Sequence, residues 1–164
     1  MFTQGQTIVH PHHGPAVVRA IVHRTVRNTS VAYLELAVLD SKLIVSVPVD
    51  RADAVGLRAV MSPEEIEALL AVVRAPSGPE VAQWSRRFKE NRERLRTGDI
   101  FTHAAIARDL TRRLESKGLS QAERDMLREA RRPIAVEVSL SLGIPIDEAE
   151  GMLHAVQVEG AAVA

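Results

Sequence analysis

The 164-residue sequence contains no cysteine. This absence excludes a disulfide framework, a thiol nucleophile and a cysteine-ligated metal site, and it fits a reducing cytosol. The sequence also has no uninterrupted run of about 18 apolar residues, the length that a membrane-spanning helix needs. Its first residues, Met1 to Gly5, lack the charged and apolar regions of a signal peptide. We therefore expect a cytoplasmic protein that neither spans a membrane nor is exported.

Common catalytic motifs are missing as well. The sequence has no G-x-x-x-x-G-K-[ST], G-x-G-x-x-G or G-x-S-x-G pattern, so phosphate-cradling loops and a serine nucleophile elbow have no support. Acidic pairs such as Glu64-Glu65 and Asp147-Glu148 fall at predicted helix starts, where the helix dipole favours them without any catalytic role. We expect a protein that is not an enzyme and needs no cofactor.

One histidine cluster is a candidate metal site. His10, His12 and His13 lie close together in the sequence, but no fixed helical spacing or carboxylate partner accompanies them. The alternative is a turn in which Pro11 fixes φ and Gly14 takes a left-handed conformation before the next strand. A metal-dependent enzyme using these histidines stays open as one hypothesis.

The formal net charge is zero, from 21 basic and 21 acidic residues, but the charges are unevenly distributed. Residues 84–132 carry fourteen Lys and Arg against eight Asp and Glu, an excess of six positive charges. Residues 133–164 carry five acidic residues and no Lys or Arg. The basic segment is charged enough to engage phosphates, so the zero net charge does not exclude a nucleic-acid partner.

The hydrophobic pattern changes near residue 61. Hydrophobic residues make up 46% of the chain, too many for general disorder. Before residue 61, β-branched runs broken by turn residues predict strands over residues 7–9, 16–22, 31–38 and 43–49, with a fifth over 55–60. Five short strands within about 60 residues indicate a small Tudor/SH3-like β-barrel as the N-terminal domain, residues 1–61.

Beyond residue 61, every segment has helical periodicity and the residues that begin and end helices. Ser62, Pro63 and Glu65 provide an N-cap, a first-turn proline and a capping box. Four more helices are expected, from Pro79 to near Gly98, from Asp99 to near Gly118, from Ser120 with Glu123 as its capping box, and from near Pro145. The predicted fold class is therefore α+β and multidomain, with a C-terminal α-helical bundle over residues 62–164.

Pro133 interrupts the fourth helical pattern. Proline lacks the backbone donor and crowds the preceding turn, so the helix is expected to kink or restart at this residue.

The segment Trp84–Arg96 holds the only tryptophan and six basic residues. On a helix, Trp84, Phe88 and Leu95 share one stripe, so Trp84 could be a core residue with the arginines on a solvated face. Alternatively, Trp84 lies exposed at the start of the helix as an apolar wedge against nucleic acid, with the neighbouring basic side chains on phosphates. Spacing alone leaves both hypotheses open.

The chain resembles the CarD/CdnL family of bacterial transcription regulators from about Phe2 to the last helix. The resemblance rests on His10 to Gly14, Val47-Pro48, Val55 to Arg58, Leu70 with Val73 to Pro76, Trp84 to Lys89, and Gly98-Asp99. It implies a Tudor-like domain that binds the RNA polymerase β subunit and a helical domain that binds promoter DNA just upstream of the −10 element. The first domain is also similar to the polymerase-binding module of transcription-repair coupling factors, but no helicase motif follows.

Carried over from the family, the wedge residue is Trp84, and the basic residues that contact the DNA backbone are Arg86, Arg87 and Lys89. Arg124 is a further candidate for the same DNA-binding face.

On the polymerase side, the family's basic residue in the second strand corresponds to Arg24, close to Val26. Ser46 occupies the position where a second basic residue is expected before Val47-Pro48. With Ser46 there, either the affinity for polymerase is lower or the interface relies more on Arg24 and on strand pairing.

The resemblance thus implies a monomeric, non-enzymatic activator that binds the polymerase β subunit and the minor groove of promoter DNA with weak sequence specificity. Such a protein would stabilise the open promoter complex and would be associated with the nucleoid through the polymerase. The alternative from another class is a protein-interaction adaptor in which Trp84 is buried and DNA is not contacted.

Overall fold

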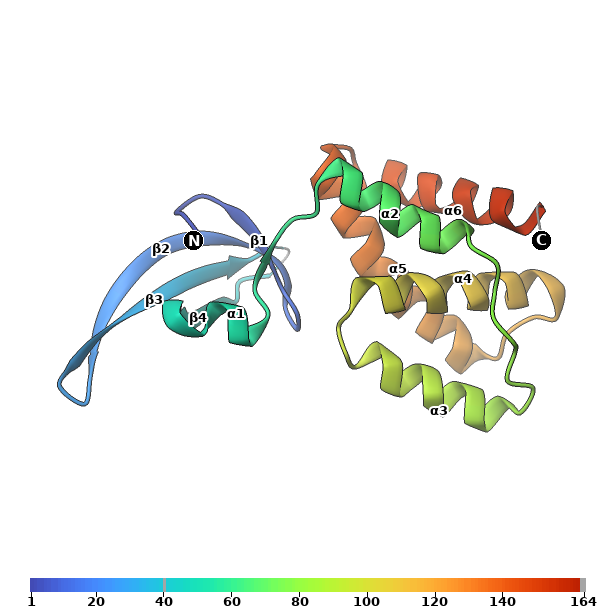
Figure 1. Cartoon of the computed structure of the whole chain (residues 1–164), viewed down its shortest axis with the longest axis horizontal. Helices are drawn as coiled ribbons and strands as arrows, with labels where there is room; N and C mark the ends of the chain where they lie inside the picture. Colours follow the sequence, from blue (N-terminus) through green and yellow to red (C-terminus); the bar gives the residue numbers. More distant parts are fainter. Residues whose placement is uncertain (40, 163–164) are drawn as a thin grey trace. The chain divides into compact units, whose positions relative to one another are not determined.

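A computed structural model describes residues 1–39 and 41–162 (Figure 1), and the chain divides into two compact units, Met1–Val60 and Met61–Ala164. The first, here called the sheet unit, contains a five-stranded antiparallel sheet. The second, the helical unit, contains only helices and their connections in its described part. The predicted fold class, a Tudor-like β domain followed by a helical bundle, is confirmed.

The strands of the sheet unit are β1 (Thr7–His10), β2 (Gly14–Val26), β3 (Thr29–Val38), β4 (Ile44–Pro48) and β5 (Arg58–Ala59). They are arranged in the order β4-β3-β2-β1-β5, with every neighbouring pair antiparallel. This order leaves β4 and β5 as the two edge strands of the sheet.

The fifth strand is shorter than the sequence predicts. A 3-10 turn, η1 (Val49–Arg51), and a short helix, α1 (Ala52–Val55), follow β4, and α1 includes Val55, the residue at which that strand was expected to begin. Gly56 ends α1 with φ +86°, a left-handed conformation that glycine adopts without steric cost. Only Arg58 and Ala59 then pair with β1.

Alternating side chains on one face of the sheet form its core. Ile8, Val18, Leu34 and Leu36 are fully or almost fully buried. Strands β2 and β3 extend beyond this core as a long curved hairpin (Figure 1). Its two turn residues, Arg27 and Asn28, both have positive φ, as expected of a two-residue turn that matches the twist of the strands.

The helical unit contains α2 (Pro63–Arg74), α3 (Trp84–Leu95), α4 (Ile100–Ser116), α5 (Gln121–Leu142) and α6 (Ile146–Ala162). The capping boxes predicted at Ser62 and Ser120 are both present. The Asp99 side chain accepts the Thr102 backbone N–H (2.9 Å) at the start of α4. The starts of α2, α4, α5 and α6 are therefore where the sequence predicts them.

The predicted start of α3 is wrong, because Pro79 does not open this helix. Residues 75–83 form an extended connection, and α3 begins at Trp84. Side chains at the end of α4 hold this connection, since Glu80 forms ion pairs with Arg113 in α4 and with Lys117, the residue that follows it. These long-range ion pairs are not visible in the local sequence pattern.

Pro133 lies within α5, and the helix continues through it without restarting. The residue is exposed, so the carbonyl group one turn earlier, at Glu129, can be hydrated instead of accepting the missing N–H. Exposure therefore makes this proline tolerable.

The core of the helical unit is formed mainly by α2, α4, α5 and α6. Its fully buried side chains include Leu69, Val73, Ile106, Met126 and Val138. Within the part of the chain that the structure describes, none of the helices has the length and apolar character to cross a bilayer.

Gly160 allows α6 to pack closely against the end of α2. A Cβ atom at this position would lie 2.8 Å from the Arg74 carbonyl oxygen. We predict that Gly160→Ala lowers the free energy of unfolding by about 1–3 kcal/mol, the usual cost of overpacking. Urea denaturation of the full chain measures this loss.

Gly151 in the same helix provides the control, because a Cβ there would meet no atom within 4 Å. Gly151→Ala should raise the free energy of unfolding by up to about 1 kcal/mol through helix propensity. Equal effects of the two substitutions would contradict the proposed packing of Gly160.

Candidate nucleic-acid interface

Trp84 is the first residue of α3, and the residue is 45% exposed. The ring stacks on Phe88 with centroids 5.3 Å apart, and Phe88 in turn packs against the core. The indole Nε1–H donates a hydrogen bond to Ser120 Oγ (3.1 Å). Trp84 is therefore fixed in place but not buried, so the hypothesis that it is a core residue is wrong.

The hydrogen bond to Ser120 joins the starts of two helices. Ser120 is the N-cap of α5, and Trp84 begins α3. Arg124, one turn further along α5, is exposed, and its Nε donates to the Leu119 carbonyl oxygen (3.3 Å). Trp84 and Arg124, which lie 40 positions apart in the sequence, thus belong to the same end of the helical unit.

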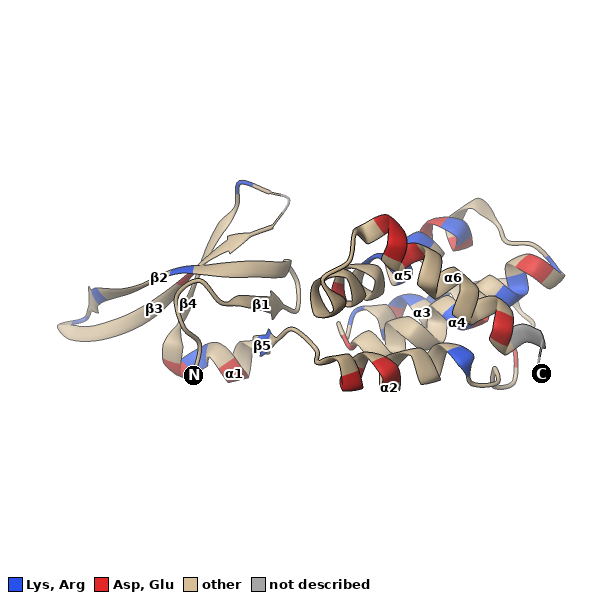
Figure 2. Ribbon diagram, turned by 90° about the horizontal axis from the view of Figure 1, so that it is seen from above, with Lys and Arg blue, Asp and Glu red and all other residues tan. Residues whose placement is uncertain are grey.

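Two of the predicted backbone-contacting residues are exposed on α3. Arg86 is 70% exposed and forms an ion pair with Glu90 (2.8 Å), one turn along the helix. Lys89 is also exposed. The whole helix carries five Lys and Arg against two Glu, whereas α6 carries four acidic residues and no Lys or Arg (Figure 2).

Arg87 does not share this exposed position. Its side chain is 8% exposed, and its Nε and Nη2 both donate to Glu123 Oε1 (2.9 and 2.7 Å) on α5. Its Nη1 donates to the Val81 and Ala82 carbonyl oxygens (2.8 and 3.3 Å) in the connection before α3. The expectation that Arg87 contacts phosphates is corrected, because these bonds use the guanidinium group inside the protein.

Glu123 connects Arg87 to Ser120. Its Oε2 accepts from the Ser120 backbone N–H (3.2 Å) and from Ser120 Oγ (3.1 Å). Burial alone raises the pKa of the Glu123 carboxyl, but the hydrogen bonds from Arg87 and Ser120 outweigh burial and leave that pKa below its ordinary value. Glu123 therefore stays ionised and keeps the network intact at neutral pH.

The local sequence pattern predicts Ser120 and Glu123 only as a capping box. In the structure they are also the partners of Trp84 and Arg87, respectively. The S-x-x-E pattern signals the cap, but no local signal indicates which distant side chains will bind to it.

In the sheet unit, Arg24 and Ser46 lie close together. Arg24 Nη2 donates to Glu35 Oε1 (3.0 Å) on β3 and to Ser46 Oγ (3.3 Å) on β4. The guanidinium carbon lies 5.2 Å from the centroid of the Tyr33 ring. Val26, near the hairpin turn, is exposed. The cluster lies next to the edge strand β4. The unpaired backbone groups of an edge strand can form hydrogen bonds to an extended segment of a partner protein.

The histidine cluster builds the turn between β1 and β2. His10 Nδ1 accepts the backbone N–H groups of His12 (3.1 Å) and His13 (3.3 Å), and Gly14 has φ +73°. Burial and then the nearby His13 and His12 rings lower the pKa of His10. The described residues contain no group of three or more His, Asp or Glu that could hold a metal ion.

Comparisons with known proteins cover both units. The family model described as "CarD-like/TRCF RID domain" matches residues 2–61, and the one described as "CarD, C-terminal domain" matches residues 68–154. The chain is also similar to the "Putative transcription factor YdeB" of Bacillus subtilis (strain 168). The two are 26% identical over 144 residues, which cover 88% of this chain and 94% of that protein.

Arg86 is exposed and Arg87 is buried, so their substitution should affect stability differently. Arg87→Ala would leave Glu123 buried without its cation, and we predict a loss of about 3–5 kcal/mol in the free energy of unfolding. Arg86→Ala removes only an exposed pair within one helix and should cost no more than about 0.5 kcal/mol. Chemical denaturation of both variants measures the difference, and similar small losses would contradict the buried position of Arg87.

Proposed function

Because the chain belongs to the CarD family, we propose that it holds RNA polymerase and promoter DNA together and thereby stabilises the open promoter complex. Members of this family are non-enzymatic transcription regulators, so the chain is not an enzyme. Its role is transcription-related and involves interaction with RNA polymerase. The β subunit as the partner, the DNA contact and the wedge role of Trp84 are the finer parts of the proposal.

The main observation that supports the proposed DNA contact is the exposure of Trp84. Trp84 is 45% exposed at the first position of its helix, and the exposed part of this large aromatic residue contributes little to folding. Proteins that deform DNA insert such apolar side chains between base steps from the minor groove. At the upstream edge of the melted region, Trp84 would stack on a base and oppose re-annealing of the strands.

Arg86, Lys89 and Arg124 would hold the DNA backbone around this wedge. All three residues are exposed. Arg124 lies one turn after Ser120, the N-cap of α5 that accepts the hydrogen bond from the Trp84 indole. Contacts of Lys and Arg to phosphates fix position and orientation without reading sequence. Sequence specificity is therefore expected to be weak.

The polymerase contact is assigned to the sheet unit. Strand β4 is an edge of the sheet, and an extended segment of the β subunit could add to it by backbone hydrogen bonds. Arg24, with Ser46 beside it and Val26 two positions further along β2, would supply the side-chain contacts.

Because one chain would contact both polymerase and DNA, a modest affinity for each partner is enough for it to act at a promoter. Binding of one unit to polymerase raises the effective concentration of the other unit at the promoter. A chain of zero net charge binds bulk DNA weakly, so the tether confines its action to promoters occupied by polymerase.

We predict that Trp84→Ala leaves polymerase binding and the fold nearly intact but shortens the lifetime of the open complex. Base stacking on an aromatic side chain contributes about 1–3 kcal/mol, which corresponds to a roughly five- to 150-fold change. Promoter-complex dissociation with the cognate polymerase measures the lifetime, and thermal unfolding of the variant checks the fold.

Leu114→Ala is the matched control, because Leu114 is an exposed apolar residue on α4 and is not part of the proposed interface. It should leave the lifetime unchanged. A Trp84 variant that behaves like this control would refute the wedge.

The polymerase contact is tested by changing its charge. Arg24→Glu would place a second carboxylate beside Glu35. It should weaken binding of the chain to the isolated β subunit and to the complete RNA polymerase. Ser46→Arg should tighten it, mainly at low salt, because exposed charges act through screened attraction. Affinity is measured by titration across a range of salt concentrations.

Gln4→Arg adds the same charge at another exposed position of the sheet unit and should have little effect. If Ser46→Arg and Gln4→Arg change the affinity equally at every salt concentration, Ser46 does not face the polymerase.

A further inference from the structure

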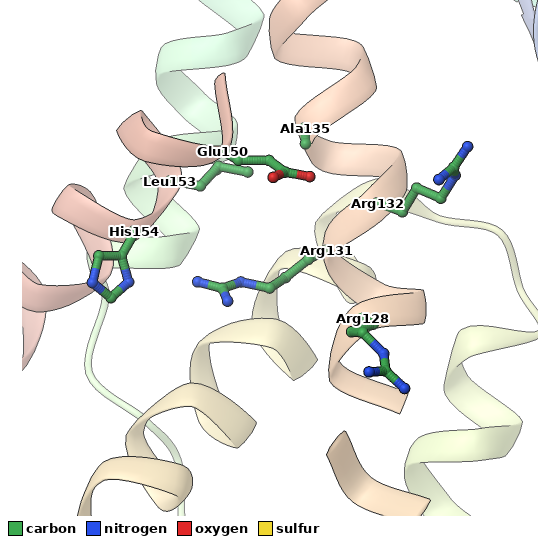
Figure 3. Close-up of a pocket in the computed structure, with 7 residues that line it drawn as sticks. All are labelled: Arg128, Arg131, Arg132, Ala135, Glu150, Leu153 and His154. Carbon is green, nitrogen blue, oxygen red and sulfur yellow. The ribbon is translucent and has the colours of Figure 1, made fainter. Parts of the chain in front are cut away.

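A cavity of about 430 Å³ lies between α5 and α6, on residues that the proposed function does not use. Its lining is shown in Figure 3 and consists of Arg128, Arg131, Arg132, Ala135, Glu150, Leu153 and His154. The volume falls within the range of pockets that bind small molecules, about 300–1,000 Å³. The mixture of three arginines with two apolar side chains suggests an anion with an organic part.

Arg131 is the central residue of the cavity. Its side chain extends from α5 toward α6, where His154 lies opposite (Figure 3). Its Nη2 donates to the amide oxygen of Gln157, which is 3% exposed. Among the residues that the structure describes, no carboxylate lies within ion-pair distance of the Arg131 guanidinium.

The charge of Arg131 is therefore only partly compensated. A neutral amide satisfies one donor but supplies no negative charge, and a half-buried cation without a counter-ion is costly. Burial lowers the pKa of the Arg131 guanidinium, although Glu150 and Glu115 act in the opposite direction. An anion that entered the cavity would replace the hydration that Arg131 has lost.

Two further arginines add positive charge. Arg128 and Arg132 are exposed, and in Figure 3 their side chains point away from Arg131 and from α6, so their charges would act on a ligand at longer range than that of Arg131. Arg128 pairs with Asp125 in its own helix. Against these three arginines the lining has a single carboxylate, that of Glu150. The excess of positive charge favours a ligand group with more than one negative charge.

We propose that this cavity binds a small molecule that carries a phosphate or diphosphate group, with Arg131 as the main cationic contact. A guanidinium group forms two parallel hydrogen bonds to a phosphate, which a point charge does not. Ala135 and Leu153 also line the cavity, but both are almost fully buried, so they offer only a small apolar contact to the organic part of the ligand. The ligand would contact both α5 and α6, so its binding should stabilise the packing of these two helices.

The proposal is tested by calorimetric titration of the full chain with inorganic pyrophosphate and, separately, with adenosine diphosphate. Arg131→Gln should weaken binding by about tenfold or more, since a charge-assisted hydrogen bond is lost. Glu150→Gln should tighten it by about three- to tenfold, because it removes the only negative charge of the lining. A gain in affinity cannot result from a misfolded variant.

Arg96→Gln is the control, because Arg96 is an exposed residue outside the cavity. It should leave the affinity for both probes unchanged. The proposal is overturned if neither probe binds, if the Arg131 and Arg96 variants bind alike, or if Glu150→Gln has no effect.

A second titration with a short DNA duplex distinguishes a small-molecule site from a DNA contact. If Arg131→Gln weakens binding of the duplex but pyrophosphate does not compete with the duplex for the chain, the cavity belongs to the DNA surface and the proposal is wrong. None of these measurements uses polymerase, so the outcome is independent of open-complex stabilisation.

Discussion

The position of Trp84 depends on the buried ion pair between Arg87 and Glu123. Of the twelve residues of α3, only Arg87 and Leu95 are buried, so this helix has a small apolar contact with the rest of the unit. Arg87 makes up for that deficit by binding α5 and the connection before α3 at the same time. Removing either charge would leave the other buried and unpaired, which is why the pair fixes the helix so firmly.

From this ion pair a chain of hydrogen bonds leads to the surface. Glu123 accepts from Ser120, and Ser120 Oγ accepts from the Trp84 indole. The indole thus satisfies its only donor within the protein and keeps a free apolar face for a partner. An immobilised aromatic ring loses little conformational entropy when it binds, so the network prepares Trp84 for the contact that we propose.

Local sequence signals predicted most of the fold and part of the site. Both capping boxes and the first four strands follow from patterns that act over a few residues. The exposure of Trp84 does not, because spacing alone left a buried and an exposed position open and only the family resemblance favoured exposure. The late start of α3 could not be predicted, because Glu80 is held by α4 through ion pairs with residues more than 30 positions away. The difference in burial between Arg86 and Arg87 could be predicted only in part from the sequence. Arg87 lies three residues after Trp84 and close to the Phe88 stripe, but its partner Glu123 is 36 positions away.

The central claim is that Trp84 touches promoter DNA while the sheet unit holds the polymerase. Replacing Trp84 by photoreactive benzoylphenylalanine in the full chain tests it directly, in a complex with cognate polymerase and labelled promoter. We expect a crosslink to DNA at the upstream edge of the melted region. A crosslink to polymerase alone, in complexes that have bound the chain and opened the promoter, would contradict it.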